Sequence, residues 1–334
     1  MAGGSTKAVY AAIVANSIVA VLKFIGFAFS GSGAMLSEGI HSIADVTNQL
    51  LLAVGIKRAE READEDHPYG YGRDKFVFAM ISAVGIFWFG CGVTLYHGIT
   101  SLLHPHPVAA LELAIGILVV SGLIESVTLW IAWVAVRDGA KKDGMALKEY
   151  LLKGSDPMGV AVLLEDGAAV LGILIALATL GLSLATGNLI FDAIGSILIG
   201  VLLGAVAAFL VVKNRTVLLG LSMSTQNTSR VVEILSGDPV VESVHDVKTT
   251  VLGTDQTRFK AEIQFDGEAI ARRFLITQDL ATIWERINTE DELRTFLIEY
   301  GDHIVEALGD EIDRLEDKVR LAAPEIRHVD LEAE

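Results

Sequence analysis

Two uncharged stretches of about twenty apolar residues constrain this chain more than any other feature. Phe76–Tyr96 runs for 21 residues without a charged side chain, and Ala193–Val212 runs for 20. As a helix, each stretch is about 30 Å long, which matches the hydrocarbon core of a bilayer. The mean hydropathy of +0.50 agrees with such segments. We therefore expect an integral membrane protein.

Four further stretches are long enough to span a bilayer but contain isolated polar groups. We therefore expect six transmembrane helices, at roughly residues 8–30, 35–56, 76–96, 109–136, 157–185 and 193–212. Lys and Arg gather in every second connection, around 57–75, 137–153 and 213–215. By the positive-inside rule, this pattern predicts cytoplasmic termini. The sequence has no recognisable targeting segment, which favours a prokaryotic plasma (inner) membrane.

The chain changes character near residue 214. Residues 1–214 carry 17 acidic and 13 basic side chains, whereas residues 215–334 carry 25 acidic and 13 basic ones. The second part alternates helical and strand-like patterns, with a long charged helix expected at 290–322 and a break near Gly301 or Gly309. The expected fold is an α-helical membrane domain of six transmembrane helices at 1–214, followed by a cytoplasmic α/β domain at 215–334.

Net charge and cysteine content exclude several classes of protein. The formal net charge is −16, so binding to nucleic-acid phosphates is not expected. Cys91 is the single cysteine, so the chain has neither an internal disulfide nor a cysteine-based zinc cluster. It lies in an apolar run, where a small packing role is expected.

Ionisable side chains inside the expected spans are the main functional signal. His41 and Asp45 are four residues apart, which places both on one helical face about one turn apart. Glu165 and Asp166 are adjacent in the fifth span. Such groups are costly in hydrocarbon unless they face the bundle interior or water. Because imidazole and carboxylates form a ligand set for Zn²⁺ and similar ions, we expect a metal site between these two helices.

Other readings of these charged groups stay open at this stage. A buried His–Asp pair also holds helices together without metal. Of the adjacent carboxylates, Asp166 lies on a face of small residues, whereas Glu165 points about 100° away and is a proton carrier or a supporting group. Lys23 and Glu125 are candidates for an ion pair or a proton or charge relay. Asp192 begins the sixth helix, where the helix dipole favours negative charge, and it is a further candidate for a proton or charge relay.

The connection after the second span is rich in acidic and turn residues. Asp64, Asp66 and His67 form a candidate surface cation site, and the alternative is a solvated loop that docks on the tail. The sequence contains no G-x-x-x-x-G-K-[ST], H-E-x-x-H or G-x-S-x-G motif. We therefore expect neither an ATP-driven pump nor an intramembrane hydrolase, and any transport must use an ion gradient.

Three motifs closely resemble the cation diffusion facilitator family of divalent metal transporters. They are SEGIHSIADVTNQ at 37–49, HPYGYGR at 67–73 and PEIRHVDLE at 324–332. The resemblance covers nearly the whole chain. It implies a ferredoxin-like cytoplasmic domain, a homodimer, and exchange of Zn²⁺ or another divalent cation for protons without an organic cofactor. The segment around Asp166 resembles the branch that contains the mammalian zinc transporter 9.

The resemblance also implies a transport site. Its residues are His41, Asp45 and Asp166, with Glu165 as the fourth ligand. Val162 stands where well-studied zinc members of the family have a His or Asp, so this site departs from their pattern.

The resemblance to the family extends only in part to two secondary metal sites, one in the loop and one in the tail. In the loop, Asp64 and His67 match the family, but Tyr71 stands where some members have a second His. In the tail, the residues at positions that bind zinc in bacterial members are His245, His328 and Asp330. Ile263 occupies a further ligand position, so a complete two-metal tail site is not expected.

Proton-coupled metal efflux is the leading functional hypothesis. Ligands must be deprotonated to bind metal, so metal binding releases protons and the two ions exchange at one site. The transported ion is most simply Zn²⁺, but a carboxylate-rich site leaves Mn²⁺, Co²⁺ and Fe²⁺ open. A membrane metal sensor or scaffold that does not transport is the alternative from another class.

Overall fold

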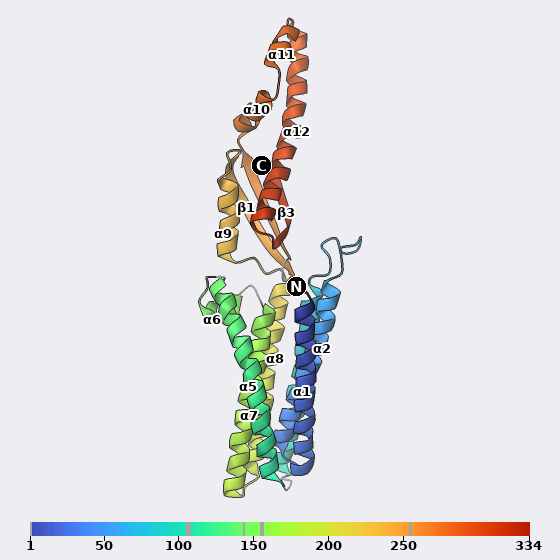
Figure 1. The fold of residues 1–334 in the computed structure, drawn as a ribbon, viewed down its shortest axis with the longest axis vertical. Coiled ribbons are helices and arrows are strands. Elements are labelled where there is room, and N and C mark those ends of the chain that lie inside the picture. The colour runs from blue at the N-terminus through green and yellow to red at the C-terminus, as the bar shows by residue number, and fades with distance from the viewer. Residues whose placement is uncertain (1, 105–107, 143, 154–156, 254–255) are drawn as a thin grey trace. The chain divides into compact units, whose positions relative to one another are not determined.

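The computed structural model divides the chain into two compact units (Figure 1). It describes residues 2–104, 108–142, 144–153, 157–253 and 256–334. The units are Met1–Leu219 and Gly220–Glu334. The division falls slightly beyond residue 214, because the last helix of the first unit continues to Leu218.

In its described residues the first unit is helical. Its elements are α1 (Ala2–Ser30), α2 (Gly33–Ala59), a continuous run of α3 (Asp74–Gly85), η1 (Ile86–Cys91) and α4 (Gly92–Leu103), then α5 (Leu111–Lys142), α6 (Leu147–Lys153), α7 (Pro157–Thr186) and α8 (Ile190–Leu218). Helices α1 and α2 pack side by side, as do α5 and α7 and also α7 and α8. Each expected span coincides with one of the long helical runs.

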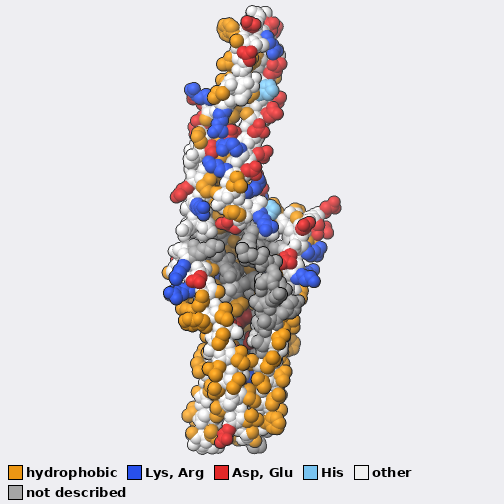
Figure 2. Space-filling view, in the orientation of Figure 1, with side chains coloured by type: hydrophobic (Ala, Val, Ile, Leu, Met, Phe, Trp, Pro, Cys, Tyr) orange, Lys and Arg blue, Asp and Glu red, His pale blue; other side chains and the backbone are white. Residues whose placement is uncertain are grey.

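Four helical runs are long and apolar enough to cross a membrane. They are Asp74–Leu103, Leu111–Lys141, Gly159–Thr186 and Ile190–Leu218. In α1 the apolar part found in the described residues is shorter, Asn16–Ser30. Helix α2 is not among the four, since polar and charged side chains interrupt it. On the face shown in Figure 2, hydrophobic side chains predominate on the visible described surface of most of the helical unit, whereas charged side chains are frequent on the second unit.

Small residues allow the helices of the first unit to approach closely. A Cβ atom at Gly195 would lie 2.3 Å from Thr179 Oγ1, and one at Gly204 would lie 2.8 Å from Cys91 Sγ. Cys91 is therefore a buried packing residue, as its apolar surroundings predict. The core of the unit includes Met35, Leu118, Ile173, Leu180, Ile199 and Leu203.

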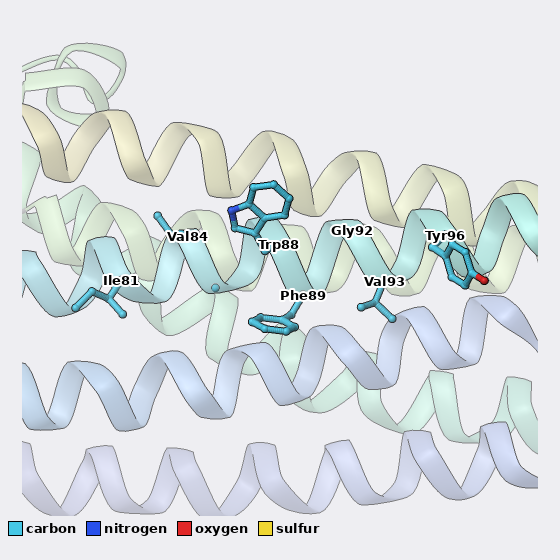
Figure 3. Close-up of a pocket in the computed structure, with 8 residues that line it drawn as sticks. Ile81, Val84, Trp88, Phe89, Gly92, Val93 and Tyr96 are labelled. Carbon is cyan, nitrogen blue, oxygen red and sulfur yellow. The ribbon is translucent and has the colours of Figure 1, made fainter.

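One π-helical segment, η1, interrupts the helical run between α3 and α4. A π-helical turn holds more residues than an α-helical one, so it rotates the side chains that follow. Beside it lies an apolar groove, lined by Ile81, Val84, Trp88, Phe89, Val93 and Tyr96 together with Gly85 and Gly92 (Figure 3). This lining carries no charged group, so the groove suits lipid contact rather than ion passage.

The second unit is an α/β domain whose described residues form a three-stranded sheet. The strand order is β1 (Val241–Gly253), β2 (Gln256–Phe265) and β3 (Ile326–Ala333), with β1 antiparallel and β3 parallel to β2. Its helices are α9 (Thr225–Ser236), α10 (Gly267–Ile276), α11 (Leu280–Arg286) and α12 (Glu290–Ala322). Side chains from α9, α12 and the sheet share one core, which includes Val231, Leu235, Phe259, Leu315 and Val319.

Helix α12 occupies the predicted range without interruption. It begins at a capping box, in which Thr289 Oγ1 accepts from the backbone N–H of Glu292 and the Glu292 carboxylate accepts from that of Thr289. The expected break near Gly301 or Gly309 does not occur. Each glycine costs a helix about 1 kcal/mol, and the hydrogen bonds of a 33-residue helix outweigh that.

Candidate metal site between α2 and α7

His41 and Asp45 lie together on one face of α2. His41 Nε2 is 3.3 Å from Asp45 Oδ2. His41 is only 4% exposed, and its Nε2 atom has no hydrogen-bond partner, because the contact with Asp45 lacks hydrogen-bond geometry. A buried ring nitrogen in this state is free to bind a cation when it is unprotonated.

Glu165 and Asp166 reach the same level of the bundle from α7. The side-chain amide of Asn48, about one turn beyond Asp45 on α2, donates a hydrogen bond to Glu165 Oε2. Thr128 of α5 hydrogen-bonds the Asp166 carboxylate. Helices α2, α5 and α7 therefore meet where the sequence predicts the metal site.

Negative charge is concentrated at this level. The Asp45 carboxylate acts electrostatically on both Glu165 and Asp166. Buried carboxylates so close together favour protons or a cation over mutual repulsion. Across the residues that the structure describes, no three His, Cys, Asp or Glu side chains converge into a ready-made metal cluster. A tetrahedral ligand set therefore requires α2 and α7 to approach further.

Lys23 of α1 is fully buried and contacts two carboxylates. Its Nζ atom is 2.8 Å from Glu125 Oε1 on α5 and 2.8 Å from Glu38 Oε2 on α2. The sequence suggests an ion pair between Lys23 and Glu125, but Glu38 is a second partner of Lys23 that was not expected. A signal for it is present, because Glu38 lies one turn before His41 on the polar face of α2.

Asp192 serves the beginning of another helix. Its carboxylate lies in the first turn of α8 but accepts hydrogen bonds from Ser32 Oγ at 2.5 Å, from the Gly33 N–H at 2.6 Å and from the Ala34 N–H at 3.2 Å. These donors form the start of α2, where backbone N–H groups have no partner within the helix. The Asp192 carboxylate therefore links the beginning of α8 to the beginning of α2.

The loop residues Asp64 and His67 form a closed turn. The Tyr71 hydroxyl donates to Asp64 Oδ2 at 2.7 Å, and the His67 backbone N–H donates to Asp64 Oδ1 at 2.8 Å. The Tyr71 hydrogen bond holds the pKa of Asp64 below its usual range. The Arg61 guanidinium lies over the Tyr71 ring, 4.1 Å from its centroid. Both oxygens of Asp64 thus have partners inside the loop.

The tail residues His245, His328 and Asp330 are not brought together. His245 lies on β1, 2.8 Å from Ser243 Oγ, whereas His328 and Asp330 lie on β3. Strand β2 separates β1 from β3. Asp330 forms an ion pair of 2.5 Å with Arg258.

Comparison with known proteins points to one family. The profile of the cation efflux transmembrane domain matches residues 9–219. The human protein named proton-coupled zinc antiporter SLC30A9, mitochondrial, is 42% identical over 332 residues, which are 98% of this chain and 58% of that protein. The Arabidopsis thaliana protein named metal tolerance protein C4 is 42% identical over 335 residues, which are 98% of this chain and 73% of that protein. The chain thus spans about 58% of the length of its human relative.

The predicted membrane is wrong. A prokaryotic plasma membrane with cytoplasmic termini is contradicted by the human, Xenopus laevis and mouse relatives, which are named as mitochondrial and match 98% of the chain at 41–42% identity. The prediction relied on the lack of a targeting segment. A chain that spans 58% of its relative carries no information about such a segment. Its integral membrane character agrees with the family and with the four membrane-capable helices.

Proposed function

The chain belongs to the cation efflux family, that of the cation diffusion facilitators, and on this premise we propose that it exchanges a divalent metal cation for protons across a membrane. The observation that carries the proposal is a group of polar and ionisable side chains inside an apolar bundle. His41 and Asp45 lie together on α2, and Asn48 of α2 donates a hydrogen bond to Glu165 of α7. Zn²⁺ is the first candidate, because the human relative is named a proton-coupled zinc antiporter.

The proposed architecture has six membrane crossings. Helices α1 and α2 add to the four membrane-capable runs, which places both termini on the same side. The second unit then forms a ferredoxin-like domain outside the membrane, and the chain acts as a homodimer. The division between helical unit and α/β unit supports this arrangement.

The proposed ligands of the transported ion are His41, Asp45, Asp166 and Glu165. One imidazole and three carboxylates suit Zn²⁺, and they also accept Mn²⁺, Co²⁺ or Fe²⁺. Glu165 supplies the fourth group where Val162 offers none. Its hydrogen bond from Asn48 holds it toward α2, so the ion joins α2 to α7.

Coupling to protons follows from competition for the same atoms. A carboxylate or imidazole that holds a proton does not bind metal, so an arriving cation releases protons and returning protons release the cation. Because the buried carboxylates repel one another, the empty site is unfavourable without one of the two ions. Rocking of helix pairs around a fixed site then exposes it alternately to the two faces.

The loop and tail residues are not part of this proposal. Asp64 is occupied by Tyr71 and His67, and Asp330 by Arg258. Asp192 is assigned the capping of α2, because its carboxylate accepts hydrogen bonds from the Gly33 and Ala34 N–H groups.

Purified protein in lipid vesicles tests the proposal directly. A zinc-sensitive dye and a pH-sensitive dye inside the vesicles should report opposite ion movements for the wild type. Asp45→Ala should abolish both signals. Asp138→Ala, which removes an exposed carboxylate from the end of α5, should leave both unchanged. Wild-type flux in Asp45→Ala would refute the site, and zinc binding without any flux in the wild type would favour the sensor.

A further inference from the structure

A second buried cation-binding pair lies beside the proposed transport site. It consists of Glu38 and Glu125, which both hold the Lys23 ammonium at 2.8 Å. The exposed fractions of Lys23, Glu38 and Glu125 are 0%, 0% and 6%. Three helices, α1, α2 and α5, thus contribute to one enclosed cluster of charges.

The charges of this cluster do not balance. Two carboxylates face one ammonium, so an excess negative charge is buried when all three are ionised. Each carboxylate also has one oxygen without a hydrogen-bond partner, Glu38 Oε1 and Glu125 Oε2. Buried carboxylate oxygens without a partner are costly. A divalent cation would balance the pair fully, whereas the ammonium balances half of it.

The free oxygen of Glu38 occupies space that α7 leaves open for it. A Cβ atom at Gly172 would lie too close to Glu38 Oε1, so an alanine at this position would force the carboxylate to move. Gly172 lies seven residues beyond Glu165, and Glu38 lies seven residues before Asp45. Both distances correspond to about 10 Å along a helix. Glu38 therefore follows the transport site along the same α2–α7 contact.

We propose that Glu38 and Glu125 form a second station for the transported divalent cation, occupied in this structure by the Lys23 ammonium. The proposal rests on the transport function argued above. A cation leaving His41 reaches Glu38 one helical turn away and displaces the ammonium. Return of the ammonium to the carboxylates then expels the cation. Lys23 is thus a tethered competitor that keeps the station from trapping metal.

Zinc binding to the full chain in lipid nanodiscs tests the proposal without requiring transport. Lys23→Met keeps an unbranched side chain of nearly the same length and removes its charge, so it should bind one more Zn²⁺ per protomer than the wild type. Lys23→Met combined with Glu125→Gln should lose that additional ion. Lys23→Arg should bind as the wild type does. Equal zinc stoichiometry in the wild type and in folded Lys23→Met would overturn the proposal.

A glycine pair provides a second test that leaves every charge in place. Gly172→Ala pushes Glu38 out of its place, whereas Gly181→Ala adds the same methyl group to α7 in open space. Gly172→Ala should slow zinc flux at least tenfold while zinc affinity at the first site changes less than threefold. Gly181→Ala should change neither. Wild-type flux in Gly172→Ala would contradict the station, yet it would leave the Asp45 test of the transport site untouched.

Discussion

Removal of the Asp192 carboxylate should loosen the first turn of α2. Asp192→Ala leaves the backbone N–H groups of Gly33 and Ala34 and the Ser32 hydroxyl without their acceptor in a buried place. A buried donor without a partner costs about 1–3 kcal/mol. Because the donors share one carboxylate, we expect a combined cost of about 3 kcal/mol, which corresponds to roughly a hundredfold more frequent local opening.

Hydrogen exchange of the chain in lipid nanodiscs measures this opening. Mass spectrometry of peptides that cover residues 31–40 should show about a hundredfold loss of protection in Asp192→Ala. Asp192→Asn keeps one acceptor oxygen without the charge, so roughly a tenfold loss is expected. Asp138→Ala should match the wild type. Unchanged exchange at the start of α2 in Asp192→Ala would refute the capping role.

The same variants separate a cap from a proton relay. A relay at Asp192 predicts that Asp192→Asn abolishes proton flux while α2 keeps its protection. A cap predicts reduced protection, with proton and zinc flux falling together because α2 also carries His41.

Three further predictions concern the site, the tail and assembly. Asp166→Asn and Glu165→Gln should both weaken zinc binding in titrations at two pH values, because an amide lacks the charge that balances a divalent ion. Wild-type zinc affinity of Glu165→Gln at both pH values would show that Glu165 is not a ligand. Burial alone would raise the pKa of Asp238, but hydrogen bonds from Arg314 and Lys318 hold it well below its usual range. Asp238→Asn should therefore lower the free energy of unfolding of the tail by about 2 kcal/mol at pH 7. The difference should shrink as the pH falls below about 4, the usual pKa of an unfolded Asp. Denaturant unfolding at pH 7 and below pH 4 measures this, and equal stability of the variant and the wild type at pH 7 would contradict it. Two acidic tails repel at low ionic strength, so Zn²⁺ should promote their association in sedimentation experiments, and a tail that stays monomeric at high concentration with zinc would count against tail-mediated dimerisation.

Local periodicity predicts the helices and the face on which the ionisable groups lie. Uncharged runs place the helix that contains Phe76–Tyr96, and an interval of four residues places His41 beside Asp45 at 3.3 Å. Both inferences depend only on neighbouring residues and on the geometry of one helix. The long charged pattern at 290–322 likewise coincides with α12, although glycine propensity alone misplaces a break.

Contacts between helices lie beyond such reasoning. Lys23 and Glu125 are 102 residues apart and Asp192 and Ser32 are 160 apart, and their meeting depends on the register and crossing of whole helices. Glu38 shows the same limit, since its position on α2 is predictable but its place between Lys23 and Gly172 is not. The loop shows a different limit. The Tyr71 hydroxyl donates a hydrogen bond to the Asp64 carboxylate, and a metal-ligand motif in the sequence does not indicate such a bond.

The bond between Lys23 and Glu38 bears on how the chain enters a membrane during its synthesis. Helices α1 and α2 are consecutive, and within the described residues neither is among the four runs that are long and apolar enough to cross a membrane. Entering hydrocarbon singly, each carries an unpaired charge that costs about 3 kcal/mol at the bilayer centre. Entering together as a helical hairpin, they carry a neutral pair whose members are 15 residues apart. Biogenesis of the bundle should thus begin with co-insertion of α1 and α2, and α5 should bring Glu125 to an ammonium that is already buried.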